Sequence, residues 1–128
     1  MALLWQGTTI DRANRILANG PDEHFVEPGG HHGDPAGGFS TTLAGFIPLP
    51  DEAGCENYAR LKANVFPNEG GPAIVEVEVP DLIVDIVLHD PVGQFAFRDM
   101  GEIRFVPGYG LEELQRIWSS FPKRMIKL

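Results

Sequence analysis

A single carboxylate on a short predicted strand is the residue of this chain best suited to chemistry. Glu102 lies in Gly101–Gly108, a mostly apolar segment that ends in Pro-Gly. Two upstream segments, Leu3–Thr9 and Gly38–Thr42, each place a polar side chain beside a glycine or a pair of hydroxyls. A carboxylate held beside a hydroxyl and an amide can stabilise charge that develops during a reaction. The three segments can line one cleft only if the fold brings them together.

The other reactive side chains do not point to a second site. The lone Cys55 excludes an intramolecular disulfide and a cysteine-based zinc site, and its acidic neighbours disfavour the thiolate. A Gly- and Pro-rich stretch, residues 20–38, carries candidate metal ligands that lack the spacing of a known zinc site: His31, His32 and Asp34, with His24 nearby. We therefore expect no metal, and we interpret this stretch as a mobile lid or a disordered loop.

The composition is that of one soluble domain. The chain has 128 residues, 43% of them hydrophobic and 22% charged, and a second core would leave each half too small. Its net charge of −8 repels phosphate backbones, so we expect no nucleic-acid partner. No apolar run is long enough to span a membrane, and no basic region precedes the first apolar residues. We expect a cytoplasmic protein that does not contact membranes, with export by a route other than Sec as the open alternative.

The first half of the chain predicts a strand, a helix and a long loop. Residues 2–6 form a predicted buried strand, and Thr8 or Thr9 then caps a helix. The helix ends at Gly20, because glycine accepts a left-handed conformation and the following proline cannot continue a helix. Its inner face comprises Ile10, Ala13, Ile16 and Leu17, and its outer face Arg12 and Arg15. The loop at 20–38 leads to a short strand or turn at 38–42.

The second half predicts two more helices and several strands. A helix runs from about 51 to 66 with Tyr58, Leu61 and Val65 on its inner face. The remaining predicted elements are strands at 73–79, 82–88, 94–98 and 102–106, a turn at 99–101, a helix at 111–120 and an edge strand at 124–128. Strands and helices do not alternate as βαβ units would. We therefore expect a single α+β domain, 1–128, with mainly antiparallel sheets and about three helices.

Taken together, the segments resemble the ADP-ribosyltransferase superfamily, the NAD-cleaving fold of bacterial toxins and poly-ADP-ribose polymerases. Leu4-Trp5-Gln6-Gly7-Thr8 is similar to the family's first strand, an aromatic residue, then Arg or His, then Gly-Thr or Gly-Ser. Gly38–Thr42 is similar to the central motif, and Gly101–Gly108 to the strand of the catalytic glutamate. The motifs are in family order over nearly the whole chain, although each alone is weakly specific. The resemblance implies a split, barrel-like sheet.

The resemblance also implies a reaction and its residues. Breaking the nicotinamide–ribose bond of NAD develops positive charge on the ribose, which Glu102 would stabilise while Ser40 orients its carboxylate. Gly7 would let the nicotinamide amide approach the backbone closely, and Phe39 would pack beside its ring. The implied NAD-binding residues are Gln6, Gly7, Thr8, Phe39 and Thr42. The product would be ADP-ribose transferred to an unknown acceptor, a protein or water.

The chain departs from the family pattern at two positions. Gln6 stands where the family has Arg or His, and an amide cannot pair with a phosphate as Arg does. Met100 stands where many transferases carry a Glu or Gln that helps to select the acceptor. A noncatalytic NAD-binding or protein-interaction module on the same fold is therefore the alternative function.

Simpler structural interpretations exist for the same residues. Glu102 can be a solvent-facing carboxylate on an edge strand, and Gln6 can satisfy backbone groups at a strand end. The hydroxyls of residues 40–42 can bond their own backbone in a turn.

Overall fold

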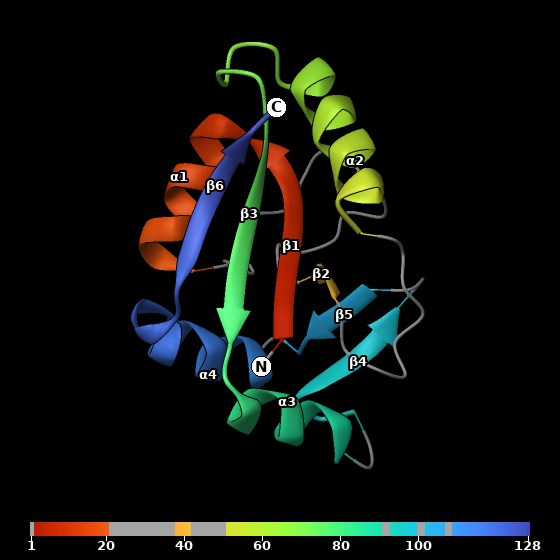
Figure 1. The fold of residues 1–128 in the computed structure, drawn as a ribbon, viewed down its shortest axis with the longest axis vertical. Coiled ribbons are helices and arrows are strands. Elements are labelled where there is room, and N and C mark those ends of the chain that lie inside the picture. Colours follow the sequence, from red (N-terminus) through yellow and green to blue (C-terminus); the bar gives the residue numbers. More distant parts are fainter. Residues whose placement is uncertain (1, 21–37, 42–50, 91–92, 100–101, 107–108) are drawn as a thin grey trace.

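The first strand and helix form where the sequence predicts them (Figure 1). The computed structural model describes residues 2–20, 38–41, 51–90, 93–99, 102–106 and 109–128. Strand β1 (Ala2–Thr9) runs into helix α1 (Ile10–Asn19), where the Thr9 hydroxyl oxygen accepts a hydrogen bond from the Arg12 amide at 3.3 Å. Gly20, with a φ of 81°, donates its N–H to the carbonyl of Ile16 at 2.8 Å and ends the helix. The N-cap is therefore Thr9, and the predicted stop at Gly20 is confirmed.

Six strands form one antiparallel sheet that does not close among the described residues. The strands added to β1 are β2 (Gly38–Thr41), β3 (Pro72–Val79), β4 (Ala96–Asp99), β5 (Glu102–Phe105) and β6 (Lys123–Lys127). Their order is β4-β5-β2-β1-β3-β6, and each neighbouring pair is antiparallel. The expected α+β class with antiparallel sheet is confirmed, and so is the edge strand at the C-terminus.

The segment after Pro80 is a helix, α3 (Asp81–Leu88), and not the strand that its alternating apolar residues predicted. The amides of Ile83 and Val84 donate to the carbonyl of Pro80 at 3.0 and 3.2 Å, which closes the first turn. Asp81 in that turn complements the helix dipole, and Ile83 and Val87 lie buried one turn apart. Six of the eight residues are apolar, so the segment matches both the two-residue repeat of a strand and the 3.6-residue repeat of a helix. The burial of Ile83 and Val87 favours the helix.

Helix α2 (Asp51–Val65) forms as predicted, but its buried face is rotated from the predicted one. Cys55, Ala59 and Lys62 are buried. Of the three residues predicted to be inside, Tyr58 is half-buried, whereas Leu61 and Val65 are 44% and 49% exposed. The small side chains of Cys55 and Ala59 allow this part of the helix to lie close to β1. Close backbone approach thus outweighs burial of the larger apolar side chains.

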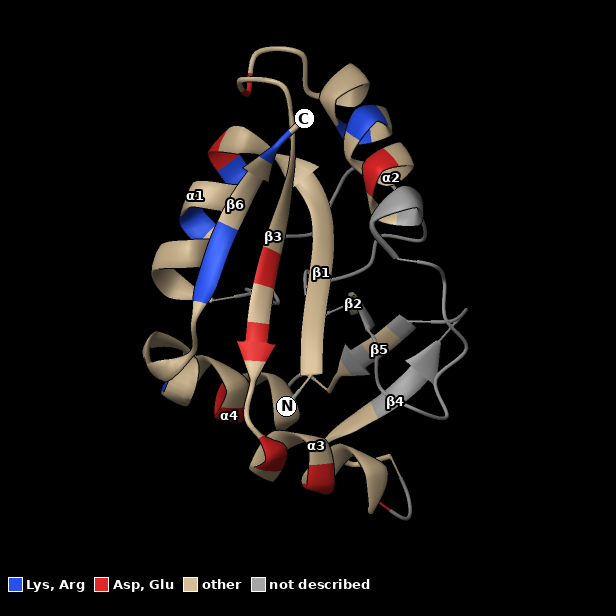
Figure 2. Cartoon of the chain, viewed as in Figure 1, with Lys and Arg blue, Asp and Glu red and all other residues tan. Residues whose placement is uncertain are grey.

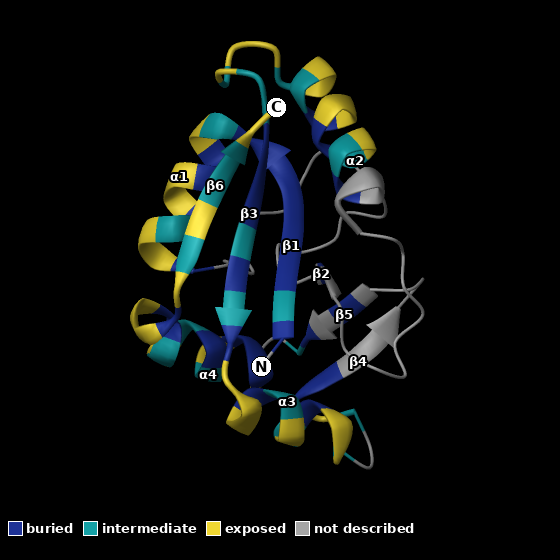
Figure 3. Cartoon of the chain, in the orientation of Figure 1, coloured by how far each residue is buried: buried dark blue, intermediate teal, exposed yellow. Residues whose placement is uncertain are grey.

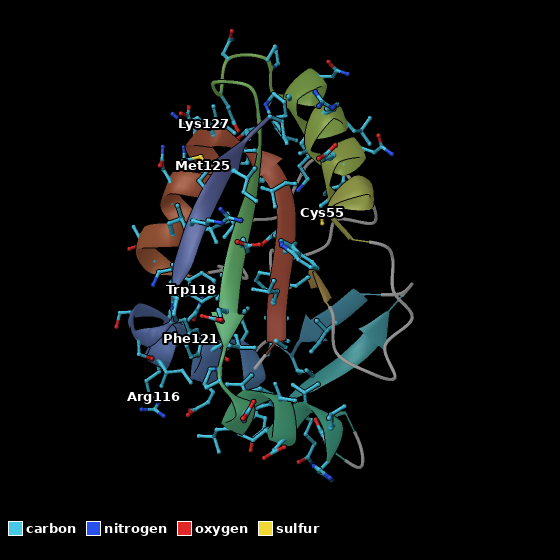
Figure 4. All side chains as sticks on the ribbon, viewed as in Figure 1. Cys55, Arg116, Trp118, Phe121, Met125 and Lys127 are labelled. Atoms are coloured by element: carbon cyan, nitrogen blue, oxygen red, sulfur yellow. The ribbon has the colours of Figure 1, made fainter. Side chains whose placement is uncertain are left out.

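The main core lies on one face of the sheet and a smaller core on the other, because Leu4 of the first and Trp5 of the second alternate along β1. Figure 3 shows that β1 is buried along most of its length. Helix α4 (Gly110–Ile117) continues into a short 3₁₀ helix, η2 (Trp118–Ser120), as the predicted last helix. The main core gathers side chains of the sheet, α1, α3, α4 and η2, including Leu4, Val75, Val77, Ala13, Ile83, Leu114 and Trp118. The second core is Trp5, Cys55 and Ile74, with Leu3 and Ile126 packed against it. Figure 4 labels Cys55 on α2 and Trp118 and Phe121 near the start of β6.

Three predictions fall on residues outside the described part of the chain. The loop at 20–38 lies there apart from its end residues, as do the histidines within it. Residues 100 and 101 of the predicted turn at 99–101, and Thr42, also lie there.

Candidate functional site

The three segments that carry the predicted site residues lie on adjacent strands, in the order β5-β2-β1. Ser40 of β2 pairs with Trp5 of β1, and Phe39 pairs with Ile103 of β5. Glu102, the first residue of β5, pairs with Asp99 of β4. The three segments from the two ends of the chain thus lie on adjacent strands. Their positions alternate between the two faces of the sheet: Ser40 is the register partner of Trp5, whereas Gln6 alternates to the main-core face.

The sheet splits between β1 and β2 directly beside Gln6. The described pairs between these strands are Leu4 with Thr41 and Trp5 with Ser40. Beyond them β1 stays paired with β3 as far as Thr9, while β2 continues along β5. We call the Trp5–Ser40 pair the fork of the sheet. Within the described residues, the stretch of β1 from Gln6 to Thr9 has no strand partner on its β2 side, so its backbone groups there need other partners.

Gln6 is buried at this fork with part of its hydrogen-bonding capacity unused. Its side chain is 8% exposed, and its Oε1 has no hydrogen-bond partner among the described residues. Gln6 alternates with Trp5 along β1, so it lies on the main-core face of the sheet with Leu4. A buried carbonyl oxygen without a donor costs about 1–3 kcal/mol. A ligand hydroxyl that donates to this oxygen would remove that cost, and the resemblance implied Gln6 as an NAD-binding residue.

Gly7 is required by the packing of α2. A Cβ atom at position 7 would lie 2.4 Å from the carbonyl oxygen of Cys55 and 3.0 Å from the backbone nitrogen of Ala59. These are backbone atoms that cannot move aside cheaply. The glycine is therefore explained by the helix, and its predicted role in admitting a nicotinamide amide stays a prediction.

Thr8 and Phe39 are core residues in this structure. Thr8 is 1% exposed and pairs with Ala73 of β3. Phe39 is fully buried and meets Phe105 edge to face, with ring centroids 6.0 Å apart. Phe39 thus holds β2 against β5, and its predicted contact with a nicotinamide ring stays a prediction.

An ion pair that the sequence did not indicate anchors the far end of the unpaired stretch. Glu69 accepts hydrogen bonds from the Thr9 hydroxyl at 2.8 Å and from Arg12 Nε at 2.7 Å. The Arg12 guanidinium also lies 3.9 Å from the centre of the Phe66 ring. Burial alone would raise the pKa of Glu69, but the hydrogen bonds from Arg12 and Thr9 and the Arg12 charge outweigh it and lower that pKa. Arg12, predicted to point outward, is buried because it serves this pair.

The described residues contain no group of three or more His, Cys, Asp and Glu that could hold a metal ion. Within the same residues, no helix is long and apolar enough to cross a membrane.

Comparison with known proteins adds nothing to this geometry. No family model, no curated protein and no solved structure matches the chain. The function therefore has to be argued from the arrangement of the residues alone.

Proposed function

We propose that this chain binds NAD at the fork between β1 and β2 and breaks its nicotinamide–ribose bond. The observation that carries the proposal is the adjacency of β5, β2 and β1, the strands of Glu102, Ser40 and Gln6. The buried Oε1 of Gln6, which has no partner among the described residues, supports a ligand with hydroxyl groups beside the split. A sheet that divides between β1 and β2 supports an architecture of the ADP-ribosyltransferase type.

The proposed reaction assigns a separate task to each residue. The bond from the ribose to nicotinamide breaks, nicotinamide leaves with the electron pair, and a nucleophile adds to the ribose carbon while losing its proton. Glu102 stabilises the positive charge on the ribose, and Ser40 orients that carboxylate. The edge of β1 beyond the fork, which has no strand partner among the described residues, receives the carboxamide of nicotinamide, and Gln6, which reaches this edge from the main-core face, accepts a hydrogen bond from a ligand hydroxyl. With water as the nucleophile the product is ADP-ribose, and with a protein side chain it is an ADP-ribosylated protein.

The test is release of nicotinamide from NAD by the purified chain, followed by chromatography. Glu102→Gln removes the charge and keeps the shape, and we expect it to lower the rate by about 10²-fold or more. The matched control is Glu112→Gln, an exposed carboxylate on α4. Equal rates for Glu102→Gln and the wild type would refute the catalytic assignment.

A second candidate is a noncatalytic NAD-binding module on the same fold. The observation that favours it is that a neutral amide, Gln6, occupies the buried position beside the fork. This candidate predicts that calorimetry detects NAD binding with equal affinity in the wild type and Glu102→Gln, without nicotinamide release from either. Affinity that is millimolar or weaker would favour a protein-interaction role instead.

A further inference from the structure

A polar network crosses three strands at the fork. Trp5 of β1 pairs with Glu76 of β3, which pairs with Arg124 of β6. The indole Nε1–H of Trp5 donates to Oε1 of Glu76 at 3.0 Å, and Nε of Arg124 bonds Oε2 of the same carboxylate. Figure 2 shows the basic residues of β6 beside the acidic residues of β3. One carboxylate thus holds an indole on one side and a guanidinium on the other.

The surroundings of Glu76 would suit an apolar side chain. Trp5 packs with Cys55 and Ile74 in the second core, and Ile126 borders the same cluster. An apolar residue of similar size often stabilises such a position as well as a partly buried ion pair does. Arg124, whose side chain is 66% exposed, adds little stability because solvent screens its charge. Packing alone therefore does not explain a carboxylate here.

The effect of the carboxylate is to fix the orientation of Trp5. An indole can rotate within an apolar cluster, but a hydrogen bond to a held carboxylate selects one orientation. The Arg124 hydrogen bond lowers the pKa of Glu76, burial opposes it, and the Trp5 hydrogen bond adds to the lowering, so the carboxylate stays charged at neutral pH.

Trp5 stands at the position where this orientation matters most. It is the last residue of β1 with a described pair on β2, and the next residue is Gln6. The indole ties this point of β1 sideways to β3, while Glu69 ties the other end of the unpaired stretch at Thr9. The stretch from Gln6 to Thr8 is thus held at both ends by carboxylates.

We propose that Glu76 is a positioning residue that acts through Trp5 to hold the fork, and with it Gln6, in the geometry that binds NAD. This inference rests on the proposed function. Arg124 in turn holds Glu76. Glu76 acts on binding, so its loss weakens the affinity for NAD. The bond-breaking step, which Glu102 carries out, is unaffected.

The experiment compares Glu76→Leu with Glu76→Gln. The leucine variant removes the acceptor for the Trp5 indole, whereas the glutamine variant keeps a carbonyl oxygen and loses only the charge. Glu78→Gln, the next acidic residue of β3, is the matched control. Leu114→Ala, a fully buried residue of α4, controls for loss of stability away from the fork.

Three measurements separate positioning from loss of structure. The chain has two tryptophans, so the indole N–H resonances of Trp5 and Trp118 are resolved by NMR, and Trp118, which donates to the carbonyl of Leu17, is the internal reference. Calorimetry gives the Kd for NAD, and nicotinamide release gives KM and kcat. A purely structural loss lowers the folded fraction, which lowers apparent kcat and leaves KM unchanged, as we expect for Leu114→Ala.

We expect Glu76→Leu to move the Trp5 resonance, leave that of Trp118 in place, and raise Kd and KM about tenfold with kcat nearly unchanged. Glu76→Gln should restore most of the affinity. If the wild type binds NAD and Glu76→Leu binds it equally well, the positioning role is wrong and the proposed function survives. A wild type that neither binds nor cleaves NAD would overturn both.

Discussion

Gly7 of β1 lies so close to Cys55 of α2 that a Cβ atom at position 7 would fall 2.4 Å from the Cys55 carbonyl oxygen. The glycine therefore sets the distance between strand and helix immediately beyond Gln6. The same contact determines which face of α2 is buried. The close packing of α2 against β1 thus depends on the absence of a side chain at position 7.

Replacing this glycine should destabilise the fold strongly. We expect Gly7→Ala to lower the free energy of unfolding by about 3 kcal/mol, at the upper end for overpacking, because the obstructing atoms are backbone. Urea unfolding followed by circular dichroism measures it. The comparison is Gly71→Ala, where the space is open and only a φ of 99° disfavours a side chain, at about 1–2 kcal/mol. A smaller loss for Gly7→Ala than for Gly71→Ala would contradict the described packing.

Replacing Gln6 should raise the stability of the protein and weaken its binding of NAD. Gln6→Met keeps the size of the side chain and removes a buried carbonyl that has no partner in the described part of the chain, so we expect the free energy of unfolding without NAD to rise by about 1 kcal/mol. The same change should abolish the increase in melting temperature that NAD produces in the wild type. A variant that is destabilised, or that still responds to NAD, would show that the amide serves the fold and not a ligand.

The Glu69 anchor should make stability depend on pH. The folded pKa of Glu69 lies below its usual value of 4.5, so its contribution is present above that pH and is lost as the pH falls through the folded pKa. At pH 7 we expect Glu69→Gln to lower the free energy of unfolding by about 1–2 kcal/mol, the worth of hydrogen bonds to a charged group. At pH 3 the difference between wild type and variant should shrink. If the free energies of unfolding of the wild type and Glu69→Gln differ equally at both pH values, the charge of Glu69 does not stabilise the fold.

The orientation of α2 predicts which of its residues matter for stability. Leu61 is half exposed, so Leu61→Ala should change the free energy of unfolding by less than about 0.5 kcal/mol. Leu114→Ala, the same change at a fully buried site, should cost about 2–5 kcal/mol. If urea unfolding shows comparable losses of free energy of unfolding for the two variants, Leu61 lies on the inner face of α2, as the sequence predicted.

Local signals were enough to predict most elements. Thr9 and Gly20 delimit α1 through capping chemistry, which depends on neighbouring residues only. Alternation at 73–79 predicts β3 because one face of that strand packs against the main core. The resemblance implied that the segments of Gln6, Ser40 and Glu102 converge, and the strand order β5-β2-β1 is known only from the structure.

The errors arose where tertiary packing decides between local alternatives. Residues 81–88 are apolar at both helical and strand spacings, and the helix is stabilised by Pro80, Asp81 and the burial of Ile83. The inner face of α2 depends on Gly7, which lies far away in the sequence. Glu69 and Glu76 carry no motif, because their partners come from other elements. Contacts of this kind, between residues distant in the sequence, can be identified only from the structure.

The most direct test of the central claim is to map NAD binding on the ¹⁵N-labelled wild-type chain by NMR. We predict that millimolar NAD shifts the backbone amides of Gln6, Gly7 and Thr8, on the unpaired stretch of β1, together with those of Phe39 and Ile103 across the fork. The amides of α3, on a separate element of the fold, should stay in place. Shifts confined to α3 and α4, or no shifts at all, would contradict an NAD site at the fork.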